Sequence, residues 1–295
     1  MQSITPQWAG WAAQLACILE ALAEKPGNVT RSKDCAKLTL VQFMASAAAV
    51  GPAFMNAEGA SVGELILRAA TDTRRLTGVN TNVGILLLLA PLIRAAVSTG
   101  GETLRSALSR VLRELDVEDA RLTFKAILLA APQGLDDVGE GDVRTTPTGL
   151  TLLGAMALAK DRDNLAREYV TDFSIIFETG LPCLKSLWEE GRRFSEAIVQ
   201  TFLVILAAFP DTDIARKLDR KAAQTVSAEA AAIVDLGGVF TKRGRDAAAA
   251  FDARLRDGER RYNPGTTADL IAGTLFAFLA AESGPEEVSV ILERW

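Results

Sequence analysis

A chain of 295 residues with a formal charge of -5 at neutral pH is long enough to bury one large core, and 49% of its residues are hydrophobic. The acidic balance argues against a nucleic-acid partner held by phosphate neutralisation, because no broad excess of Lys and Arg is present. The absence of histidine excludes Ser-His-Asp hydrolysis, His-ligated zinc and phosphotransfer through His. Any chemistry must therefore rest on carboxylates, Lys, Tyr or a metal bound by oxygen.

Neither a leader segment nor a membrane span is expected from the apolar stretches. Residues 1–11 contain no basic segment ahead of an apolar stretch, so we expect no secretory signal. The longest apolar run, Val83 to Val97, is interrupted by Pro91 and Arg94 and is shorter than the roughly 20 residues that span a bilayer. We interpret this run as a buried core helix and expect no membrane partner.

The three cysteines, Cys17, Cys35 and Cys183, are odd in number and far apart in the sequence. Their spacing matches neither a disulfide framework nor a metal site, which is typical of a reducing compartment. We therefore interpret them as small buried hydrophobic residues and predict a cytoplasmic protein.

Helical periodicity runs along almost the whole chain. Apolar residues recur at spacings of three and four, whereas the alternating pattern of strands is scarce. The clearest predicted helices, in chain order, are 11–24, 62–70, 104–115, 194–209 and 270–281. Turn signals such as Pro26-Gly27 and Gly51-Pro52 divide the chain into about a dozen helices. We predict one compact all-α domain over residues 1–295.

Five polar clusters lie where the predicted helices begin or end. They are residues 25–34, 77–82, 136–144, 211–217 and 263–269. The N-terminus of a helix presents unpaired N–H groups and a partial positive charge, so loops of Gly, Asn and Thr before a helix can hold phosphate. The same residue types are also ordinary caps and turns. The third cluster falls within an acidic, glycine-rich segment, 131–149, and a long loop in a compact helical protein is often functional.

Structural explanations cover several of these clusters equally well. Residues 266–269 form a capping-box pattern, and Asp211 could cap the helix that follows it. The i, i+4 spacing of a surface ion pair occurs twice, at Asp213 and Lys217 and at Asp163 and Arg167. Charged faces with this spacing usually contact only solvent.

Two clusters carry a stronger signal for a ligand. Asn80 and Thr81 precede a buried helix and could act as its caps. An amide without a hydrogen-bond partner is costly in the interior, so groups of the protein or of a ligand must bond to these side chains. Lys25, Arg31 and Lys33 concentrate positive charge in an acidic protein. This loop is either a solvated turn or a phosphate site.

Taken in order, these motifs resemble the triphosphoribosyl-dephospho-CoA synthase family, which makes the prosthetic-group precursor of citrate lyase and malonate decarboxylase. The resemblance rests on Glu20, the KPGN loop from Glu24 to Arg31, the GVNTN segment 78–84 and the NPG segment 263–270. It spans essentially the whole chain. Each motif is weak alone, but the ordered set is fairly specific.

Two details qualify this resemblance. The middle of the chain, at 141–144, 159–163 and 210–217, is similar to the branch found in archaea and some methyl-compound-using bacteria, whose members commonly lack a citrate lyase partner. The sequence also departs from the family pattern, with Thr30 where a histidine is common and Thr266 in a segment that is often glycine-serine. The acceptor substrate is therefore open, and the missing imidazole cannot be an essential base.

The resemblance implies glycosyl transfer from ATP with Mg²⁺, in which a hydroxyl of dephospho-CoA attacks the ribose and adenine leaves. It implies Glu20 and Asp269 as catalytic residues, and Asp211 and Asp142 as metal ligands. The residues expected to bind ATP or its phosphates are Lys25, Gly27, Asn28, Arg31, Asn80, Thr81, Asn82, Arg144, Arg216, Lys217, Asn263, Gly265, Thr266 and Thr267. Glu20 is either the general base or a rim carboxylate paired with Lys25.

Two other functions remain open from the sequence. A protein of the same fold could use ATP on a different acceptor, as a transferase or phosphotransferase in the synthesis of a one-carbon carrier cofactor. A non-catalytic nucleotide-binding or scaffold protein would also fit, because each cap has a structural explanation. The apolar segments 36–55 and 83–99 could form a homodimer or simply belong to the core.

Overall fold

The computed structural model describes residues 3–34, 38–130, 149–256, 258–281 and 286–295, and its described part contains fifteen α-helices and no β-strand. The prediction of an all-α fold is confirmed. The helices are α1 Pro6–Leu22, α2 Leu40–Phe54, α3 Val62–Thr77, α4 Val83–Ala96, α5 Leu104–Glu114, α6 Val117–Ala130, α7 Leu152–Ala159, α8 Asn164–Val170, α9 Leu181–Glu189, α10 Phe194–Ala208, α11 Thr212–Lys217, α12 Arg220–Asp235, α13 Lys242–Leu255, α14 Gly265–Ala281 and α15 Val288–Glu293. A π-helix, η1 (Ile175–Gly180), and a 3₁₀ turn, η2 (Gly238–Phe240), complete the order.

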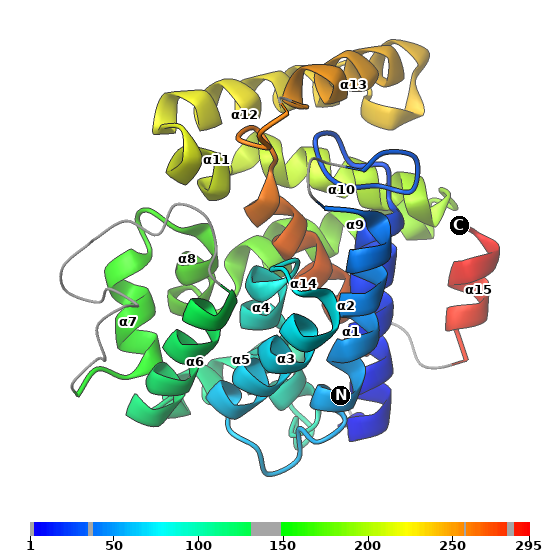
Figure 1. Cartoon of the computed structure of the whole chain (residues 1–295). Coiled ribbons are helices and arrows are strands. Elements are labelled where there is room, and N and C mark those ends of the chain that lie inside the picture. Colours follow the sequence, from blue (N-terminus) through cyan, green and yellow to red (C-terminus); the bar gives the residue numbers. More distant parts are fainter. Residues whose placement is uncertain (1–2, 35–37, 131–148, 257, 282–285) are drawn as a thin grey trace.

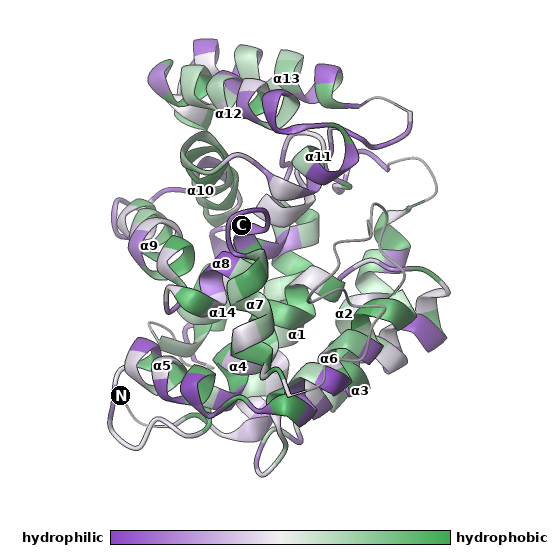
Figure 2. Ribbon diagram, turned by 90° about the vertical axis from the view of Figure 1, so that its left-hand side faces the viewer, coloured by the Kyte–Doolittle hydropathy of each residue, from purple (hydrophilic) through white to green (hydrophobic). Residues whose placement is uncertain are grey.

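The core is organised around α4 and α14, which pack against each other near the centre of the molecule (Figure 1). Helix α14 also contacts α1 and α10, and none of the residues of α4 is exposed. Figure 2 shows the same arrangement in hydropathy, with hydrophobic residues gathered along α1, α4 and α14 and hydrophilic ones along the outer helices. The interpretation of the run from Val83 as a buried core helix is therefore confirmed.

One predicted turn is wrong. Helix α2 continues through Gly51-Pro52 and ends at Phe54. Any Cβ at Gly51 would collide with the side chain of Gln14 on α1, so the glycine at this position serves the close crossing of α1 and α2. The glycine at position 51 therefore has a structural role, but that role is the packing of two helices and not a turn of the chain.

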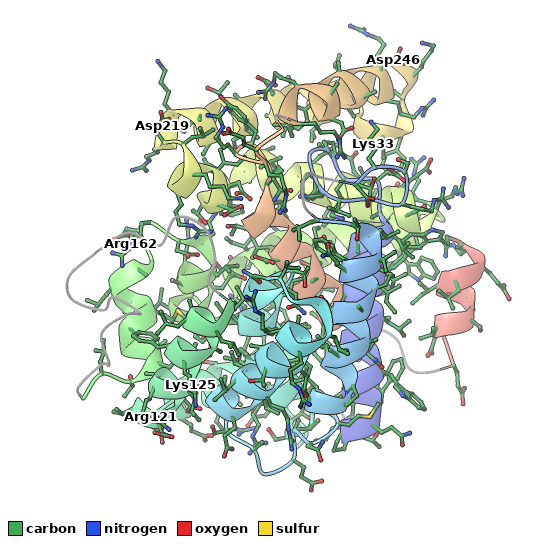
Figure 3. All side chains as sticks on the ribbon, viewed as in Figure 1. Lys33, Arg121, Lys125, Arg162, Asp219 and Asp246 are labelled. Atoms are coloured by element: carbon green, nitrogen blue, oxygen red, sulfur yellow. The ribbon has the colours of Figure 1, made fainter. Side chains whose placement is uncertain are left out.

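Helices α12 and α13 form a layer at the top of the molecule in Figure 1, above α10 and α11. The loop after α1 reaches this layer through Asp252 on α13, which accepts hydrogen bonds from Gly27 N (2.8 Å) and Lys33 Nζ (2.6 Å). Figure 3 shows Lys33 beside α13. Two parts of the chain more than two hundred residues apart are thus fastened together beside the candidate site.

None of the described helices combines the length and the apolar character needed to cross a bilayer. Since α4 lies inside the core, segment 83–99 cannot offer that helix as the face of a homodimer. Of the two predicted dimer segments, only the one containing α2 retains exposed residues on its helix, Val41 among them.

Candidate active site

A cavity of about 2430 Å³ opens between the lower helices and the upper layer. The first turns of α4, α8, α11 and α14 all contribute to its wall, together with residues 28–29, 79–82 and 258–261. Sites for a single drug-sized ligand have volumes of about 300–1,000 Å³, so this cavity has room for two large substrates. Several helix N-termini around one space favour ligands that carry negative charge.

Most of the predicted site residues meet at this cavity. Its wall includes Glu20, Asn28, Asn80, Thr81, Asn82, Arg216, Lys217, Asn263, Gly265, Thr266 and Asp269. The two ends of the chain are joined directly, because Asn28 Nδ2 donates to Asn263 Oδ1 at 2.9 Å. Lys25, Gly27, Arg31, Asp211 and Thr267 are not part of the wall, and Asp142 and Arg144 lie outside the described residues.

Glu20 and Lys25 form a buried ion pair at the end of α1. Lys25 Nζ lies 3.0 Å from Glu20 Oε1, and the two side chains are 0% and 4% exposed. The same ammonium donates to the carbonyl oxygens of Glu20 and Ala23, which belong to the last turn of α1, where a positive charge is favourable. The predicted pairing is confirmed, but its position at a rim is wrong, since both groups are enclosed.

The cations of the KPGN loop do not point into the cavity, although the sequence had led us to expect this. Lys25 faces the end of α1 rather than the cavity, and the N–H of Gly27 is directed to Asp252. Arg31 is exposed and does not line the cavity. The loop therefore holds Glu20 in place, and its positive charges do not line the space where a ligand would lie.

Asp269 is on the first turn of α14 and lines the cavity against Gly84. The predicted capping box is wrong: α14 begins at Gly265, so Thr266 is already inside the helix, and no hydrogen bond to Asp269 exists within the described residues. Burial, and then the nearby carboxylates of Glu20, Asp213 and Asp211, raise the pKa of Asp269 well above its usual value.

Asp211 joins α11 to α14 beneath the cavity. Its Oδ1 accepts from the N–H groups of Asp213 (2.9 Å) and Ile214 (3.1 Å), which confirms the predicted cap. Its Oδ2 accepts from both N and Oγ1 of Thr267, each at 2.7 Å. Burial, and secondarily the charge of Asp213, raise the pKa of Asp211 to about 6. With four hydrogen bonds this carboxylate has no lone pair left for a metal ion.

The cations of the cavity gather around α8 and α11. Arg216 Nη2 and Lys217 Nζ each lie 2.5 Å from the carboxylate of Asp213, so the predicted i, i+4 pair is confirmed, although it lines the cavity and is only partly exposed. The second predicted pair is wrong. Asp163 caps α8 by accepting from Leu165 N at 2.8 Å, and the guanidinium of Arg167 lies over the ring of Phe209.

Sequence reasoning missed several further cations. The wall contains nine Lys or Arg residues against six Asp or Glu residues, in an acidic protein. The additional cations are Arg74, Lys160, Arg162, Arg167, Arg220, Arg260 and Arg261. Figure 3 shows Arg162 at the α7–α8 side. Lys160 and Arg162 belong to the segment 159–163 that carries part of the resemblance, but the other cations had no signal in the sequence beyond charge that is also typical of a solvated face.

Several polar groups before α4 have internal partners. Asn80 Oδ1 accepts from the N–H groups of Asn82 (3.3 Å) and Val83 (3.2 Å), so Asn80 acts as a cap. The hydroxyl of Thr81 is hydrogen-bonded to Ser46, and Asn82 Nδ2 donates weakly to Thr73. On the opposite wall, Asn28 Oδ1 and Arg260 Nε are buried without a hydrogen-bond partner among the described residues. Such groups are costly, and a bound ligand would satisfy them.

Fold and cavity together define an all-α protein with a large cavity in which basic residues outnumber acidic ones and whose wall includes the carboxyl groups of Glu20 and Asp269. The sequence model of the ATP:dephospho-CoA triphosphoribosyl transferase family matches residues 6–287. The chain therefore belongs to this family of transferases, as the motifs predicted.

Individual relatives agree with this assignment. Two relatives carry the name probable 2-(5''-triphosphoribosyl)-3'-dephosphocoenzyme-A synthase. The protein from Stutzerimonas stutzeri is 27% identical over 86% of this chain and 85% of its own length. The protein from Pseudomonas fluorescens is 29% identical over 93% of this chain and 93% of its own length. A crystal structure from Archaeoglobus fulgidus assigned to triphosphoribosyl-dephospho-CoA synthase has 30% identity and a TM-score of 0.64 over 81% of this chain and 98% of its own.

Proposed function

We propose that this enzyme transfers the 5-triphosphoribosyl group of ATP to the 2'-hydroxyl of 3'-dephospho-CoA and releases adenine. One observation carries the proposal: Glu20 and Asp269, from opposite ends of the chain, face one cavity whose other wall carries Arg216 and Lys217. A glycosyl transfer from ATP needs carboxyl groups near the anomeric carbon and cations around the phosphates. The family to which the chain belongs, and the names of its relatives, support this reaction.

The triphosphate is best accommodated at the α8–α11 wall. Arg216 and Lys217 share the carboxylate of Asp213, and Arg216 Nη1 also lies 4.0 Å from Asp163 Oδ2. Over the whole wall of the cavity, nine Lys or Arg residues exceed six Asp or Glu residues. The N-terminus of α14, at Gly265 and Thr266, adds the partial positive charge of a helix start to the cavity wall. Lys25, which we predicted as a phosphate ligand, acts in this proposal through Glu20 instead.

Glu20 acts as the general base. The ammonium of Lys25, 3.0 Å from Glu20 Oε1, fixes the position of this carboxyl group at the cavity wall. In the transfer the C1'–N9 bond of ATP breaks, the C1'–O2' bond forms, and the hydroxyl proton moves to Glu20. The amides of Asn80, Asn82 and Asn263 are placed along the wall to orient sugar hydroxyls.

Mg²⁺ fits the described residues poorly as a protein-held ion. Asp211 has no free lone pair, Asp142 lies outside the described residues, and no group of three candidate ligand side chains occurs in the described part of the chain. Mg²⁺ is commonly held by substrate phosphates with one or two carboxylates, so we propose that it enters with ATP. No step of the reaction is derived through it.

The decisive experiment is incubation of the purified protein with Mg-ATP and dephospho-CoA, followed by chromatography and mass spectrometry. The proposal predicts free adenine and a triphosphoribosylated acceptor in equal amounts. Adenine release only with another acceptor would support the one-carbon cofactor alternative, and ADP or AMP would indicate a phosphotransferase. If no product forms and Mg-ATP gives no thermal shift, the protein is a scaffold, because saturating ligand should stabilise it by about 2.7 kcal/mol at 100 times the dissociation constant.

Two expectations about the environment of the enzyme belong with this proposal. Cys17 and Cys183 are free thiols, in keeping with a reducing cytoplasm. A homodimer would have to use α2 or another exposed surface, and light scattering after size exclusion would establish the number of chains.

A further inference from the structure

Asp269 differs from the other acidic residues at the cavity in having no donor. Glu20 is paired with Lys25, whereas Asp269 accepts no hydrogen bond and makes no ion pair with any described residue. Its carboxyl group lies against Gly84 on α4, so closely that any Cβ at position 84 would collide with it. A carboxyl group left unpartnered at the wall of a cavity is available to a ligand.

The charged groups around Asp269 are almost all negative. Glu20 acts on it from α1, Asp213 from α11, Asp211 from the cap of α11 and Asp163 from the cap of α8, while Gly84 of α4 lies against its carboxyl group. The nearby ammonium and guanidinium groups are already bonded, Lys25 to Glu20 and Arg216 and Lys217 to Asp213. The thiol of Cys17, on α1, is also close enough to sense the charge of Asp269 and is itself buried.

The two carboxyl groups at the cavity wall, Glu20 and Asp269, therefore have opposite electrostatic surroundings. Glu20 has the ammonium of Lys25 in contact, while burial and, after it, four neighbouring acidic groups raise the pKa of Asp269 well above its usual value. Pairs of carboxyl groups with environments that differ in this way divide the roles of base and acid between them. A protonated carboxyl group is also a hydrogen-bond donor, which an ionised one is not.

We propose that Asp269 is the general acid of the transfer and that its O–H protonates a ring nitrogen, N7 or N3, of the departing adenine. The inference rests on the proposed function, since it presumes that the C1'–N9 bond of ATP is broken. The electron pair of that bond stays with the base, and protonation lets adenine leave as a neutral molecule. Glu20 gains the hydroxyl proton, Asp269 loses one, and exchange with solvent restores both groups.

The test compares Asp269→Asn with the wild type in full-length protein, using ATP, 7-deaza-ATP and 3-deaza-ATP as donors. With ATP the substitution should lower kcat by about 10²–10⁴-fold, the usual contribution of a general acid. With the analogue that lacks the protonated nitrogen, the wild type should already be slow, and the substitution should cost less than about threefold (roughly 0.65 kcal/mol). The chemically matched control is Asp246→Asn, since Asp246 is exposed on α13 and paired only with Lys242.

A pH profile gives a second readout that does not depend on the variant folding. Wild-type kcat/KM with ATP should fall as the pH rises through the raised pKa of Asp269, and this alkaline limb should vanish with the responsible deaza analogue. An equal loss with all three donors in Asp269→Asn, or an alkaline limb unchanged by both analogues, overturns the general-acid role. An unchanged rate with ATP does so too. If the wild type releases no adenine at all, the proposed function itself fails.

Discussion

The two walls of the cavity use charge in opposite ways. On the α1–α14 wall, Glu20 and Asp269 face the space with one buried cation, Lys25, directed to only one of them. On the α8–α11 wall, Arg216 and Lys217 share the carboxylate of Asp213, and Asp163 lies 4.0 Å from Arg216. Further positive charge on this wall comes from Arg162, Arg167 and Arg220. An acidic protein can thus bind a polyanion at one wall and carry out acid-base chemistry at the other, because charge is separated within one cavity rather than averaged over the surface.

The largest expected effect is at the paired carboxylate. Glu20→Gln should lower kcat by about 10²–10⁴-fold through loss of the base, and should destabilise the fold by about 3–5 kcal/mol because Lys25 is left buried without a counter-charge. The double variant Glu20→Gln/Lys25→Met should regain much of the stability but none of the rate. Denaturant unfolding and adenine release measure the two quantities separately. Recovery of activity in the double variant would show that Glu20 is only structural.

Substitutions at the α8–α11 wall should change the KM for ATP rather than kcat. Arg216→Ala or Lys217→Ala should raise the KM for ATP by about 10–100-fold, since a hydrogen bond to a charged group is worth about 1.5–3 kcal/mol. Lys242→Ala is the control, because its side chain is 84% exposed and belongs to the upper layer. A loss confined to kcat, with KM unchanged, would mean that these cations do not hold the phosphates of the bound substrate.

Asp211 tests whether a carboxylate beneath the cavity is structural. Asp211→Asn removes half of an acceptor set that joins α11 to α14 and should cost about 1–3 kcal/mol of stability. The Mg²⁺ concentration that gives half-maximal activity should stay unchanged, because this group is not a free ligand. A shift of that concentration by tenfold or more would show that Asp211 is a metal ligand, as the resemblance implied.

The smallest expected effect is on the pH dependence of stability, through Glu168, a buried carboxyl group without a lysine partner. Among the described residues, Glu168 accepts hydrogen bonds from the N–H groups of Ile175 and Ile176, and burial raises its pKa to about 7. Its folded pKa lies above the unfolded value of about 4.3, so the stability it contributes is present at acidic pH and is lost as the pH rises towards 7. The wild type should lose about 1–2 kcal/mol more than Glu168→Gln between pH 5 and pH 8. Parallel curves for the two proteins would refute this.

Much of the fold followed from apolar periodicity, because the helices of this protein bury whole faces against one another. Helix α4 was predicted from its composition, and the helices at 194–209 and 270–281 correspond to α10 and α14 within a few residues. The continuation of α2 through Gly51-Pro52 could not be predicted, since a glycine that lets two helices cross closely looks the same in the sequence as a glycine in a turn.

The sequence predicted which residues lie at the candidate site better than it predicted the directions of their side chains. The ordered motifs located the Glu20, Asn80, Arg216 and Asp269 that meet at the cavity. They could not give the direction of Lys25, because a lysine five residues after a glutamate can point outward to a phosphate or back to the end of its own helix. Burial decides between these, and burial depends on α13 and α14 packing over the loop, a contact between distant parts of the chain.

The account depends most on the division of one bound nucleotide between the two walls. A crystal structure with an unreactive ATP analogue tests it directly. We expect the anomeric carbon of the ribose between Glu20 and Asp269, with the triphosphate in contact with Arg216 and Lys217. A triphosphate bound instead at the exposed side of the KPGN loop, against Arg31 and Lys33, or a nucleotide outside this cavity, would contradict it.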